Sequence, residues 1–266
     1  MRVLSLLLIV VMLPGCAWLT RTSYEPTSGQ AGKDMVWVPT PDDTVETMLD
    51  LAGVTADDYV IDLGSGDGRM VIGAARRGAR GLGIEYNGDL VALSRQNARD
   101  AGVQRLASFR EADIFKTDFT DADVIMLFML PDLIMKIRPQ LLAMRPGTRI
   151  VSNTFMIGDG DDTWPPDVTR KNSDDCHTWC TAHLWIVPAR IDGVWMVGDT
   201  RLEVSQHFQS FFGTLGGTPI GGGAIKGASV TFTASGRTYT GTVSADGRRI
   251  EGDSWTAVRP PTTPHP

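Results

Sequence analysis

Carboxylates and glycines are packed together in one short stretch of the sequence, DYVIDLGSGDGRM. Gly64, Gly66 and Gly68 follow the apolar run YVIDL, where a buried strand is expected to turn into a helix. A turn without Cβ atoms lets the main chain approach a ligand closely, and the helix N-terminus beyond it offers free N–H groups and a partial positive charge. The chemistry predicted for this turn is therefore the binding of a small charged molecule.

The spacing of the glycines separates two ligand classes. A dinucleotide places its pyrophosphate on the pattern G-x-G-x-x-G. Here the third glycine arrives early, at Gly68, and position 69 is Arg. Asp62 lies in the strand just ahead and Asp67 lies within the loop, and carboxylates in these places repel a pyrophosphate. The stretch thus favours a ligand that carries cationic groups over NAD.

VIDLGSGDGR resembles the first motif of the class I S-adenosylmethionine (SAM)-dependent methyltransferases. The resemblance implies SAM as the cofactor, with the strand-end acid and the glycine loop holding its methionine part. It also implies that the acid in GIEYN holds the ribose hydroxyls and that the acid in READIF meets the adenine amine, under apolar cover from Ile114 and Phe115. The expected cofactor-binding residues are Asp62, Gly64, Ser65, Gly66, Asp67, Gly68, Glu85, Tyr86, Asp113, Ile114 and Thr40.

A narrower likeness covers VPTPDDTVETML, LFMLP and RPGTRIVSNTF. These segments resemble the small methyltransferases related to the mitochondrial protein-lysine N-methyltransferases, including those that act on an ATP-synthase ring subunit. The likeness implies that residues 38–41 fold over the cofactor and that the acceptor enters beside residues 127–131. Phe128 and Asn153 stand where relatives often carry Tyr and His, so a hydroxyl and an imidazole are missing here.

Methyl transfer from a sulfonium requires alignment, desolvation and a cavity for the acceptor. An amine acceptor must arrive neutral, which a nearby carboxylate or a dry pocket promotes. Asp132 and Phe128 are the expected catalytic residues, with Asp123 as a further candidate and Tyr86 as a further channel residue. The alternative interpretation makes Asp132 a first-turn acid of a helix and Phe128 a core residue.

The elements that must position these residues alternate along the chain. Helical patterns are predicted at 41–54, 69–78, 89–102 and 131–147, and strands at 59–63, 80–86, 105–115, 122–130 and 148–155. Such alternation predicts an α/β fold, a Rossmann-like doubly wound sheet with helices on both faces. The methyltransferase domain is predicted to span residues 35–196, and HLWIVPARI is expected to complete its sheet.

Beyond this domain the sequence predicts a small antiparallel β appendage over residues 197–258 and a disordered tail over residues 259–266. Ser235-Gly236 and Asp246-Gly247 are expected as hairpin turns. The aromatic residues expected in the core of the appendage, with a binding stripe as the alternative, are Phe208, Phe211, Phe212 and Trp255.

The N-terminus has the pattern of an exported protein. Arg2 precedes an apolar run that is too short to span a membrane, and Pro14-Gly15-Cys16 follows. Residues 1–16 resemble a bacterial lipoprotein signal with Cys16 lipidated, and an uncleaved anchor is the alternative. The expected location is the cell envelope, on the periplasmic side rather than in the cytoplasm, with residues 17–34 as a flexible tether.

Two cysteines remain, Cys176 and Cys180, and in an exported chain they predict a disulfide. Free thiols, or a metal site with His177 and His183, are the alternatives, and no metal is expected because the ligand spacing is poor. The formal net charge of −6 argues against a nucleic-acid partner.

Together these features predict a SAM-dependent methyltransferase that acts on an amine, either a protein lysine or a small molecule. The alternative is a non-catalytic envelope lipoprotein that uses the fold as a binding module. The sequence carries no signal for the oligomeric state.

Overall fold

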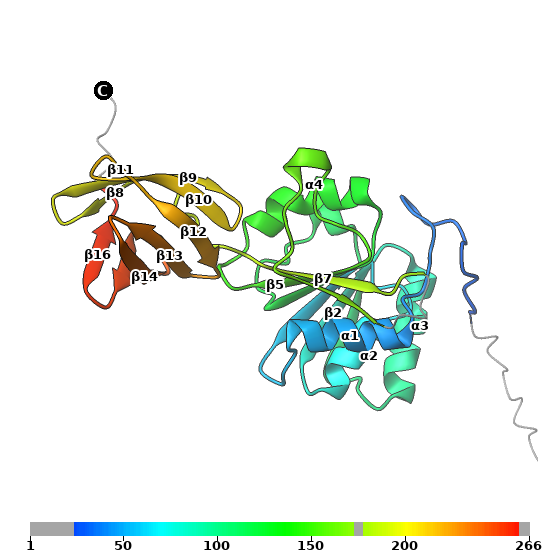
Figure 1. Cartoon of the computed structure of the whole chain (residues 1–266). Helices are drawn as coiled ribbons and strands as arrows, with labels where there is room; N and C mark the ends of the chain where they lie inside the picture. Colours follow the sequence, from blue (N-terminus) through cyan, green and yellow to red (C-terminus); the bar gives the residue numbers. More distant parts are fainter. Residues whose placement is uncertain (1–23, 173–177, 261–266) are drawn as a thin grey trace, which may run out of the picture.

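Two sheets, joined end to end, make up the computed structural model, which describes residues 24–172 and 178–260 (Figure 1). The first sheet has seven strands in the order β3-β2-β1-β4-β5-β7-β6. Its strands are β1 (Tyr59–Leu63), β2 (Arg80–Glu85), β3 (Ala107–Glu111), β4 (Val124–Leu127), β5 (Arg149–Asn153), β6 (Val168–Lys171) and β7 (Thr181–Ile186). The helices are α1 (Asp42–Ala52), α2 (Arg69–Arg76), α3 (Gly88–Asp100) and α4 (Pro131–Leu142).

The pairing in this sheet confirms the predicted doubly wound α/β fold. β1 pairs in parallel with β2 and β4, β2 with β3, and β4 with β5. β7 then adds antiparallel to β5, as expected for HLWIVPARI, and β6 pairs antiparallel with β7 at the edge. Because β1 to β5 run the same way, their carboxyl ends and the loops after them gather at one edge of the sheet.

Helices cover both faces of the sheet because its central strands are apolar on both sides. Every residue of β4 is buried, as are four of the five in β1. On one face, residues of α4 pack with Ile61 and Leu63; on the other, residues of α1 pack with Val60. Figure 1 shows α4 on the opposite side of the sheet from α1 and α2. α1 ends at Ala52, two residues before the predicted limit, and Gly53 with its left-handed φ of 59° forms its C-cap.

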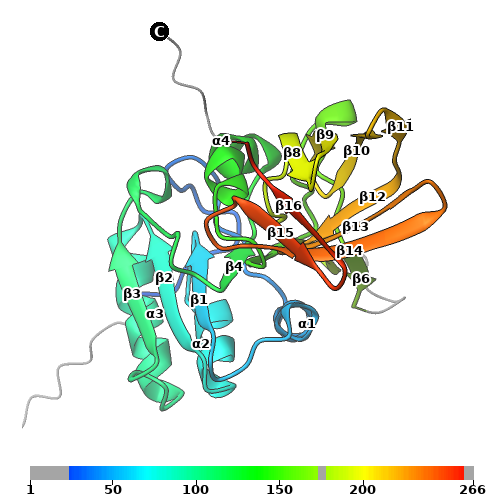
Figure 2. The same cartoon turned by 90° about the vertical axis from the view of Figure 1, so that its left-hand side faces the viewer.

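The second sheet closes on itself. Its order is β11-β10-β12-β13-β14-β15-β16-β8-β9, and an additional pairing of β9 with β10 joins the ends, so that eight strands form a barrel (Figure 2). The strands are β8 (Gly193–Val197), β9 (Thr200–His207), β10 (Ser210–Leu215), β11 (Thr218–Pro219), β12 (Gly221–Lys226), β13 (Ser229–Ala234), β14 (Arg237–Val243), β15 (Arg249–Gly252) and β16 (Trp255–Val258). The second sheet therefore begins at Gly193, ahead of the expected boundary at Val197.

The barrel corrects one detail of the sequence analysis. The glycine-rich segment around residues 213–226 lies inside the predicted β appendage and is largely strand, in β10, β11 and β12. Among the aromatic residues expected in its core, Phe211 is buried and Trp255 packs against the core, but Phe212 is 64% exposed and Phe208 packs on the other domain. Both expected turns lie between strands; Ser235 and Gly236 connect Ala234 to its partner Arg237.

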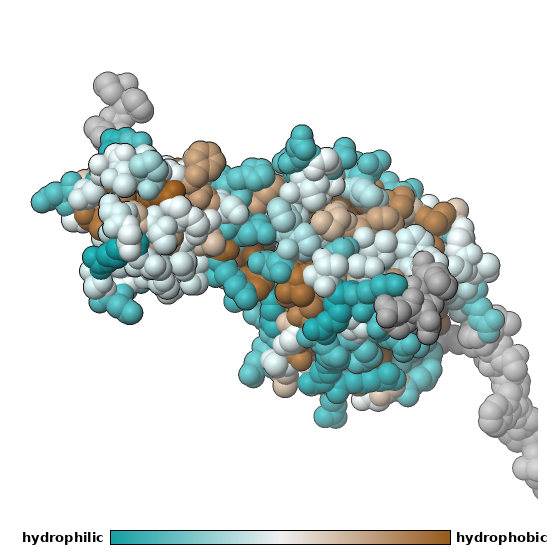
Figure 3. Space-filling view, viewed as in Figure 1, coloured by the Kyte–Doolittle hydropathy of each residue, from teal (hydrophilic) through white to brown (hydrophobic). Residues whose placement is uncertain are grey.

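Phe208 anchors the barrel to the first domain. Its ring stacks on that of Trp164, with centroids 5.9 Å apart and an interplanar angle of 11°. Beside it, the Gln209 side-chain amide donates a 2.7 Å hydrogen bond to the Pro165 carbonyl. On the face seen in Figure 3, hydrophobic residues gather where the two lobes meet. The two domains thus share a packed junction.

Part of the expected flexible tether at 17–34 is held against the first domain, because Lys33 donates a hydrogen bond to Asp113, and the segment before it has hydrogen bonds of its own. Trp37 and Gly29–Gln30 exchange main-chain hydrogen bonds of 2.8 and 2.9 Å, and the Gln30 side chain donates to the Tyr24 hydroxyl. We call residues 30–40 the strap. None of the described helices is long and apolar enough to cross a membrane, and the expected signal segment, residues 1–16, lies outside the described residues.

Candidate active site

A cavity of about 430 Å³ opens at the carboxyl edge of β1, β2 and β4. This volume lies within the usual range for small-molecule sites, roughly 300–1,000 Å³. Its wall comes from the strap, from the turn after β1, from the start of α3, from residues 112–115, and from Phe128 and Leu133. Of the expected cofactor-binding residues, the cavity wall includes all except Gly68.

The glycine turn is shaped by what lies against it. Gly64, Gly66 and Gly68 have φ values of 84°, 53° and 85°, in the left-handed region that glycine adopts without strain. A Cβ on Gly66 would lie 2.6 Å from Nε1 of Trp37, a strap residue. The strap therefore packs directly on the bare backbone of the turn, and a side chain at position 66 would push it away.

Asp62 is the buried charge of the site. Its residue is 3% exposed, and none of the described residues hydrogen-bonds to its carboxyl or forms an ion pair with it. Burial raises the pKa of Asp62 to about 8, with smaller contributions from the negative charges of Glu85 and Asp67. A carboxyl group in this position calls for a cationic partner, and the cavity is where one can enter.

Glu85 is held rigidly at the end of β2. One carboxylate oxygen accepts a 2.9 Å hydrogen bond from the Gly66 N–H and the other accepts one of 2.9 Å from the Asn87 N–H. The carboxylate keeps further lone pairs for a ligand, because each oxygen has about two acceptor sites. This geometry suits the expected grip on two adjacent hydroxyls.

Asp67 differs from Asp62 and Glu85, because its carboxylate already forms an ion pair with Arg69. Arg69 Nη2 lies 2.6 Å from one of its carboxylate oxygens, and Arg69 Nε donates to both. The expectation that Asp67 binds the cofactor is revised accordingly: its main chain lines the turn, but its carboxylate is engaged by the protein. Among the described residues, the two acidic side chains of the site that have no cationic partner are Asp62 and Glu85.

At the far end of the cavity, Asp113 is bound by a residue that the sequence analysis had placed in the tether. Lys33 Nζ donates a 2.9 Å hydrogen bond to Asp113 and lies 4.4 Å from the centroid of the Tyr86 ring. The hydrogen bond from Lys33 lowers the pKa of Asp113, and the Phe115 N–H supports the same carboxylate. Ile114 and Phe115 complete this end of the wall.

The opposite end of the cavity, where the acceptor is expected, is aromatic. Phe128 lies in the cavity wall, and its ring centroid is 5.3 Å from that of Trp179 and 6.1 Å from that of Phe155. We call Phe128, Phe155 and Trp179 the aromatic trio. Sequence reasoning missed Phe155 and Trp179, since only the fold brings the ends of β4 and β5 beside the segment before β7.

Thr40, from the VPTP segment, is 3% exposed beside this end, and Asn153 donates a 3.4 Å hydrogen bond to its hydroxyl. Asn153 also accepts from the hydroxyl of Thr154, whose φ of 64° is unusual for a β-branched residue. Asn153 is fully buried and serves as an orienting amide rather than as the acid or base that His would supply.

Two carboxylates considered for catalysis lie elsewhere. Asp132 is exposed in the first turn of α4 and is absent from the cavity wall, so it is the first-turn acid of the alternative interpretation. Asp123 precedes β4, at the opposite edge of the sheet, where it accepts from the Tyr59 N–H and pairs with Arg145. Asp123 thus lies away from the cavity, whereas Asp132 lies outside the cavity wall but next to Leu133, which lines it.

The described residues hold no cluster that could bind a metal ion, and the alternative metal site, two of whose four members lie outside these residues, stays a prediction. His183 is buried, its ring meets the hydroxyl of Thr169 at 2.9 Å, and burial lowers its pKa, so the ring is neutral. Cys180 is disulfide-bonded. Cys176 and His177, the other members of the two predictions, lie outside the described residues.

Comparison with known proteins identifies the class. The family described as the ANTKMT methyltransferase domain matches residues 62–167, a range that ends before the barrel. A solved structure from Salinibacter ruber, described as an RNA methyltransferase in complex with S-adenosyl-L-homocysteine, is 45% identical with a TM-score of 0.53, over 58% of this chain and 96% of its own. The fold, the cavity and this likeness define a SAM-dependent methyltransferase.

The curated relatives narrow the class to a family. A protein-lysine N-methyltransferase of Saccharolobus islandicus is 37% identical over 57% of this chain and 92% of its own length. The chain therefore belongs to the protein-lysine N-methyltransferase family. Mouse adenine nucleotide translocase lysine N-methyltransferase is 34% identical over 41% of this chain, and the chain spans about half the length of that relative, 53%.

The residues present fit SAM. The buried Asp62 faces the cavity without a cationic partner, the glycine turn exposes main chain, and Glu85 is fixed for hydroxyls. Asp62 and the glycine turn would hold the amino-acid part, Glu85 the ribose, and Ile114 and Phe115 would cover the base. When bound, SAM supplies a methyl group on a sulfonium that is already an activated leaving group.

Proposed function

We propose that this enzyme methylates the side-chain amine of a lysine in a protein. The observation that carries the proposal is the aromatic trio at one end of the cofactor cavity, with Phe128 in the cavity wall itself. Aromatic rings suit the four-carbon stem of lysine, which buries readily against apolar surface while its nitrogen reaches further. Relatives named as lysine N-methyltransferases in an archaeon and in animals support the same acceptor.

The aromatic trio can also favour the neutral, reactive form of the lysine amine. Rings that exclude water disfavour the charged form of an entering ammonium and lower its pKa, so that a nitrogen lone pair becomes available. Phe128 and Leu133 narrow the space around the acceptor, and the buried Thr40–Asn153 pair fixes the neighbouring backbone. Catalysis then rests on alignment and desolvation by this chain rather than on a dedicated base.

A specific observation favours a second acceptor, RNA, because the Salinibacter ruber relative is described as an RNA methyltransferase. The formal net charge of −6 weighs against it, since RNA-binding surfaces are usually basic. Protein is therefore the acceptor that we propose.

The two acceptors are separated by one labelling experiment. Wild-type enzyme and Asp62→Ala are each incubated with methyl-labelled SAM and a host extract, divided into RNase-treated, protease-treated and lysine-blocked portions. With wild-type enzyme we expect label that survives RNase, disappears after lysine blocking, and is recovered as methyl-lysine on acid hydrolysis. With Asp62→Ala we expect no label. Label that RNase removes and lysine blocking spares would overturn the proposal in favour of RNA.

We further propose that the enzyme is attached to the cell envelope through a lipidated Cys16, or through the uncleaved apolar segment before it, with the domains on the periplasmic side. The proposal is supported by the signal-like residues 1–16 and by the disulfide at Cys180. Intact-mass analysis of the membrane-extracted protein, with protease accessibility in spheroplasts, tests both points. A full-length, unmodified chain that is protected from external protease would contradict them, and would instead place the site where SAM is made.

A further inference from the structure

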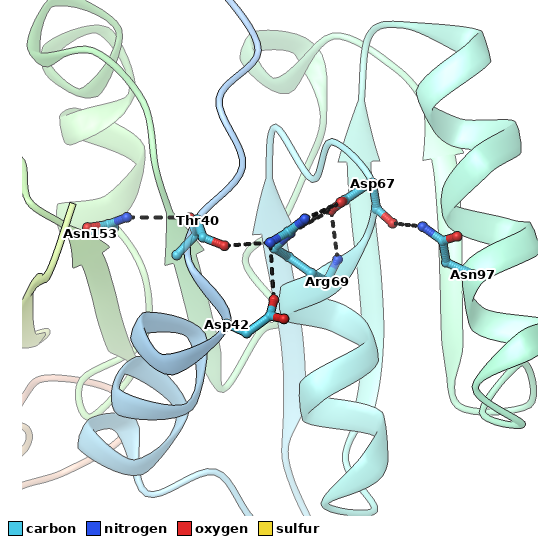
Figure 4. Close-up of polar contacts among 6 residues, drawn as sticks. All are labelled: Thr40, Asp42, Asp67, Arg69, Asn97 and Asn153. Atoms are coloured by element: carbon cyan, nitrogen blue, oxygen red, sulfur yellow. Dashed lines mark hydrogen bonds and ion pairs between the residues drawn. The ribbon is translucent and has the colours of Figure 1, made fainter. Parts of the chain in front are cut away.

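Arg69 is the first residue of α2 and the hub of a polar network beneath the strap (Figure 4). Its Nη1 donates a 2.7 Å hydrogen bond to the main-chain carbonyl of Thr40 and lies 3.1 Å from Asp42. Its Nε and Nη2 hold the carboxylate of Asp67 from the side, at 3.0 and 2.6 Å. One guanidinium therefore joins the strap, the glycine turn and the start of α1.

The network extends to two further elements of the first domain. Asn97 of α3 donates a 2.9 Å hydrogen bond to the Asp67 carbonyl, and Asn153 at the end of β5 donates to the Thr40 hydroxyl. Figure 4 shows Arg69 between these two outer contacts. The glycine turn is thus tied to α3, the strap is tied to β5, and Arg69 is the link between the two.

The number of N–H donors that Arg69 already uses within the protein shows whether it is free to bind a ligand. A guanidinium has five N–H donors and no acceptor. The contacts to Asp67, Thr40 and Asp42 engage four of them, one on Nε, two on Nη1 and one on Nη2. Although Arg69 lies in the cavity wall, its charge and nearly all its donors are committed to the protein, so it is poorly placed to bind the carboxylate of the cofactor.

We propose that Arg69 is a positioning residue that fixes the strap on the glycine turn and thereby sets the affinity for the cofactor. Eleven consecutive residues of the wall, 30–40, belong to the strap. Trp37 lies against Gly66, and Arg69 holds the C-terminal end of the strap at the Thr40 carbonyl. The inference concerns the cofactor side of the site and holds whichever acceptor the enzyme uses.

Removing the guanidinium has two local consequences. The Thr40 carbonyl loses its hydrogen bond from Nη1, which frees the end of the strap. The Asp67 carboxylate, whose side chain is only 16% exposed, loses the ion pair that holds the glycine turn to Arg69. We expect the strap to loosen even without cofactor, and cofactor to dissociate faster.

Arg77 offers a matched control. It caps the other end of α2 and bridges to α1 through Glu46 and Asp50, with N–O distances of 2.6 and 2.7 Å. Like Arg69 it joins α1 to α2 through carboxylates, but it is absent from the cavity wall. Arg77→Met thus removes a comparable helix-to-helix link without touching the strap.

The test compares the full-length wild type with Arg69→Met, Arg69→Lys and Arg77→Met. S-adenosylhomocysteine affinity is measured by calorimetry, and hydrogen exchange of residues 30–40 is measured without ligand. We expect Arg69→Met to weaken binding at least tenfold and to speed exchange in the strap, and Arg77→Met to stay within twofold of wild type in both. Arg69→Lys should lie between, because a lysine offers a point charge in place of a planar fork.

Unchanged exchange of residues 30–40 in Arg69→Met overturns the inference, and so does an equal loss of affinity in Arg77→Met, which would assign the effect to general α1–α2 packing. A failure of methyl transfer to protein, with S-adenosylhomocysteine binding intact, contradicts the proposed function and leaves this inference standing. Should Arg69→Met not fold, Arg69→Lys carries the same two readouts.

Discussion

The two sheets of the chain bury different kinds of side chain. Every buried polar or charged side chain among the described residues lies between Thr40 and His183, in the first domain. The barrel core is built from apolar and aromatic residues, with Phe232 packed on the rings of Phe211, Tyr239 and Trp255. A parallel sheet gathers its loops at one edge and can place polar groups there, whereas a small closed barrel fills its interior with side chains.

The two domains therefore have separate roles. The wall of the cavity is drawn entirely from residues 30–133, so the barrel contributes nothing to the cofactor site. The barrel meets the first domain instead through Phe208 and Gln209, on Trp164 and Pro165. Stability of the barrel and affinity for the cofactor should therefore respond to different substitutions.

The largest expected effect is on the stability of the barrel. Phe232 is 1% exposed, and Phe232→Ala should cost about 3–5 kcal/mol of unfolding free energy because it removes a buried ring from a filled interior. Denaturant unfolding followed by circular dichroism measures it, with the 64% exposed Phe212→Ala as the control that changes little. S-adenosylhomocysteine affinity should not change while the protein stays folded; a parallel loss of affinity would break the comparison.

The next effect is on cofactor affinity. Asp62→Asn keeps the shape of the side chain but removes the carboxyl group that can ionise when a cationic amino group binds, so S-adenosylhomocysteine binding should weaken at least about 100-fold, roughly 2.7 kcal/mol. Calorimetry measures the change. Asp132→Asn, an exposed first-turn acid outside the cavity wall, serves as the control and should bind within twofold of wild type. Equal losses of affinity in the two variants would show that Asp132 also contributes to cofactor binding.

The raised pKa of Asp62, about 8, makes the empty site sensitive to pH. Since the folded protein holds this proton more tightly than the unfolded chain does, the associated stability is complete below about pH 4 and is lost as pH rises towards 8. The melting temperature of Asp62→Asn minus that of wild type should therefore increase between pH 5 and pH 8. A gap that narrows over this range would contradict the assignment.

Ligand binding probes the same proton. A cationic amino group beside Asp62 favours the carboxylate, so binding of S-adenosylhomocysteine at pH 7 should release up to one proton, and at pH 9 close to none. Calorimetry in two buffers of different ionisation enthalpy measures the number. Asp62→Asn should release none from this position at either pH.

Some parts of the cofactor site could be predicted from the sequence, and others could not. YVIDL became β1 within the predicted limits, and the acids at the strand ends reached one cavity, because period and apolar runs determine where parallel strands end. The role of Lys33 was not predicted, because a polar segment rich in Gly and Ser resembles a linker until its contact with Asp113 is known. Trp37 lay inside the predicted domain, but its packing on Gly66 depends on a tertiary contact that the sequence does not show.

The sequence predicted the β appendage as a whole but did not delimit its glycine-rich strands. Glycine lowers strand propensity, yet a Cβ on Gly213 would lie 1.8 Å from the Glu203 carbonyl oxygen, and one on Gly223 would lie 2.2 Å from that of Phe211. At these points two backbones pass closer than any side chain allows. Glycine inside a strand marks such an approach only once the partner strand is known.

The smallest predicted effect concerns the junction between the two regions. Phe208 opens the two-residue turn between β9 and β10, where His207 pairs with Ser210, and its φ of 52° is one that glycine adopts more easily than phenylalanine. Packing of its ring on Trp164 offsets that strain. Both Phe208→Ala and Phe208→Gly should loosen the junction, but Phe208→Gly should be the more stable of the two by about 1 kcal/mol, because it alone relieves the backbone.

Thermal unfolding of the two variants measures this difference, which corresponds to roughly 2–4 °C for a chain of this size. Neither variant should change S-adenosylhomocysteine affinity, since the junction and the cavity share no residue. If Phe208→Ala proves as stable as Phe208→Gly, the turn is not strained, and the ring is a passive contact. If either variant weakens cofactor binding, the barrel communicates with the site through Trp164, and the division of labour drawn from the two cores is wrong.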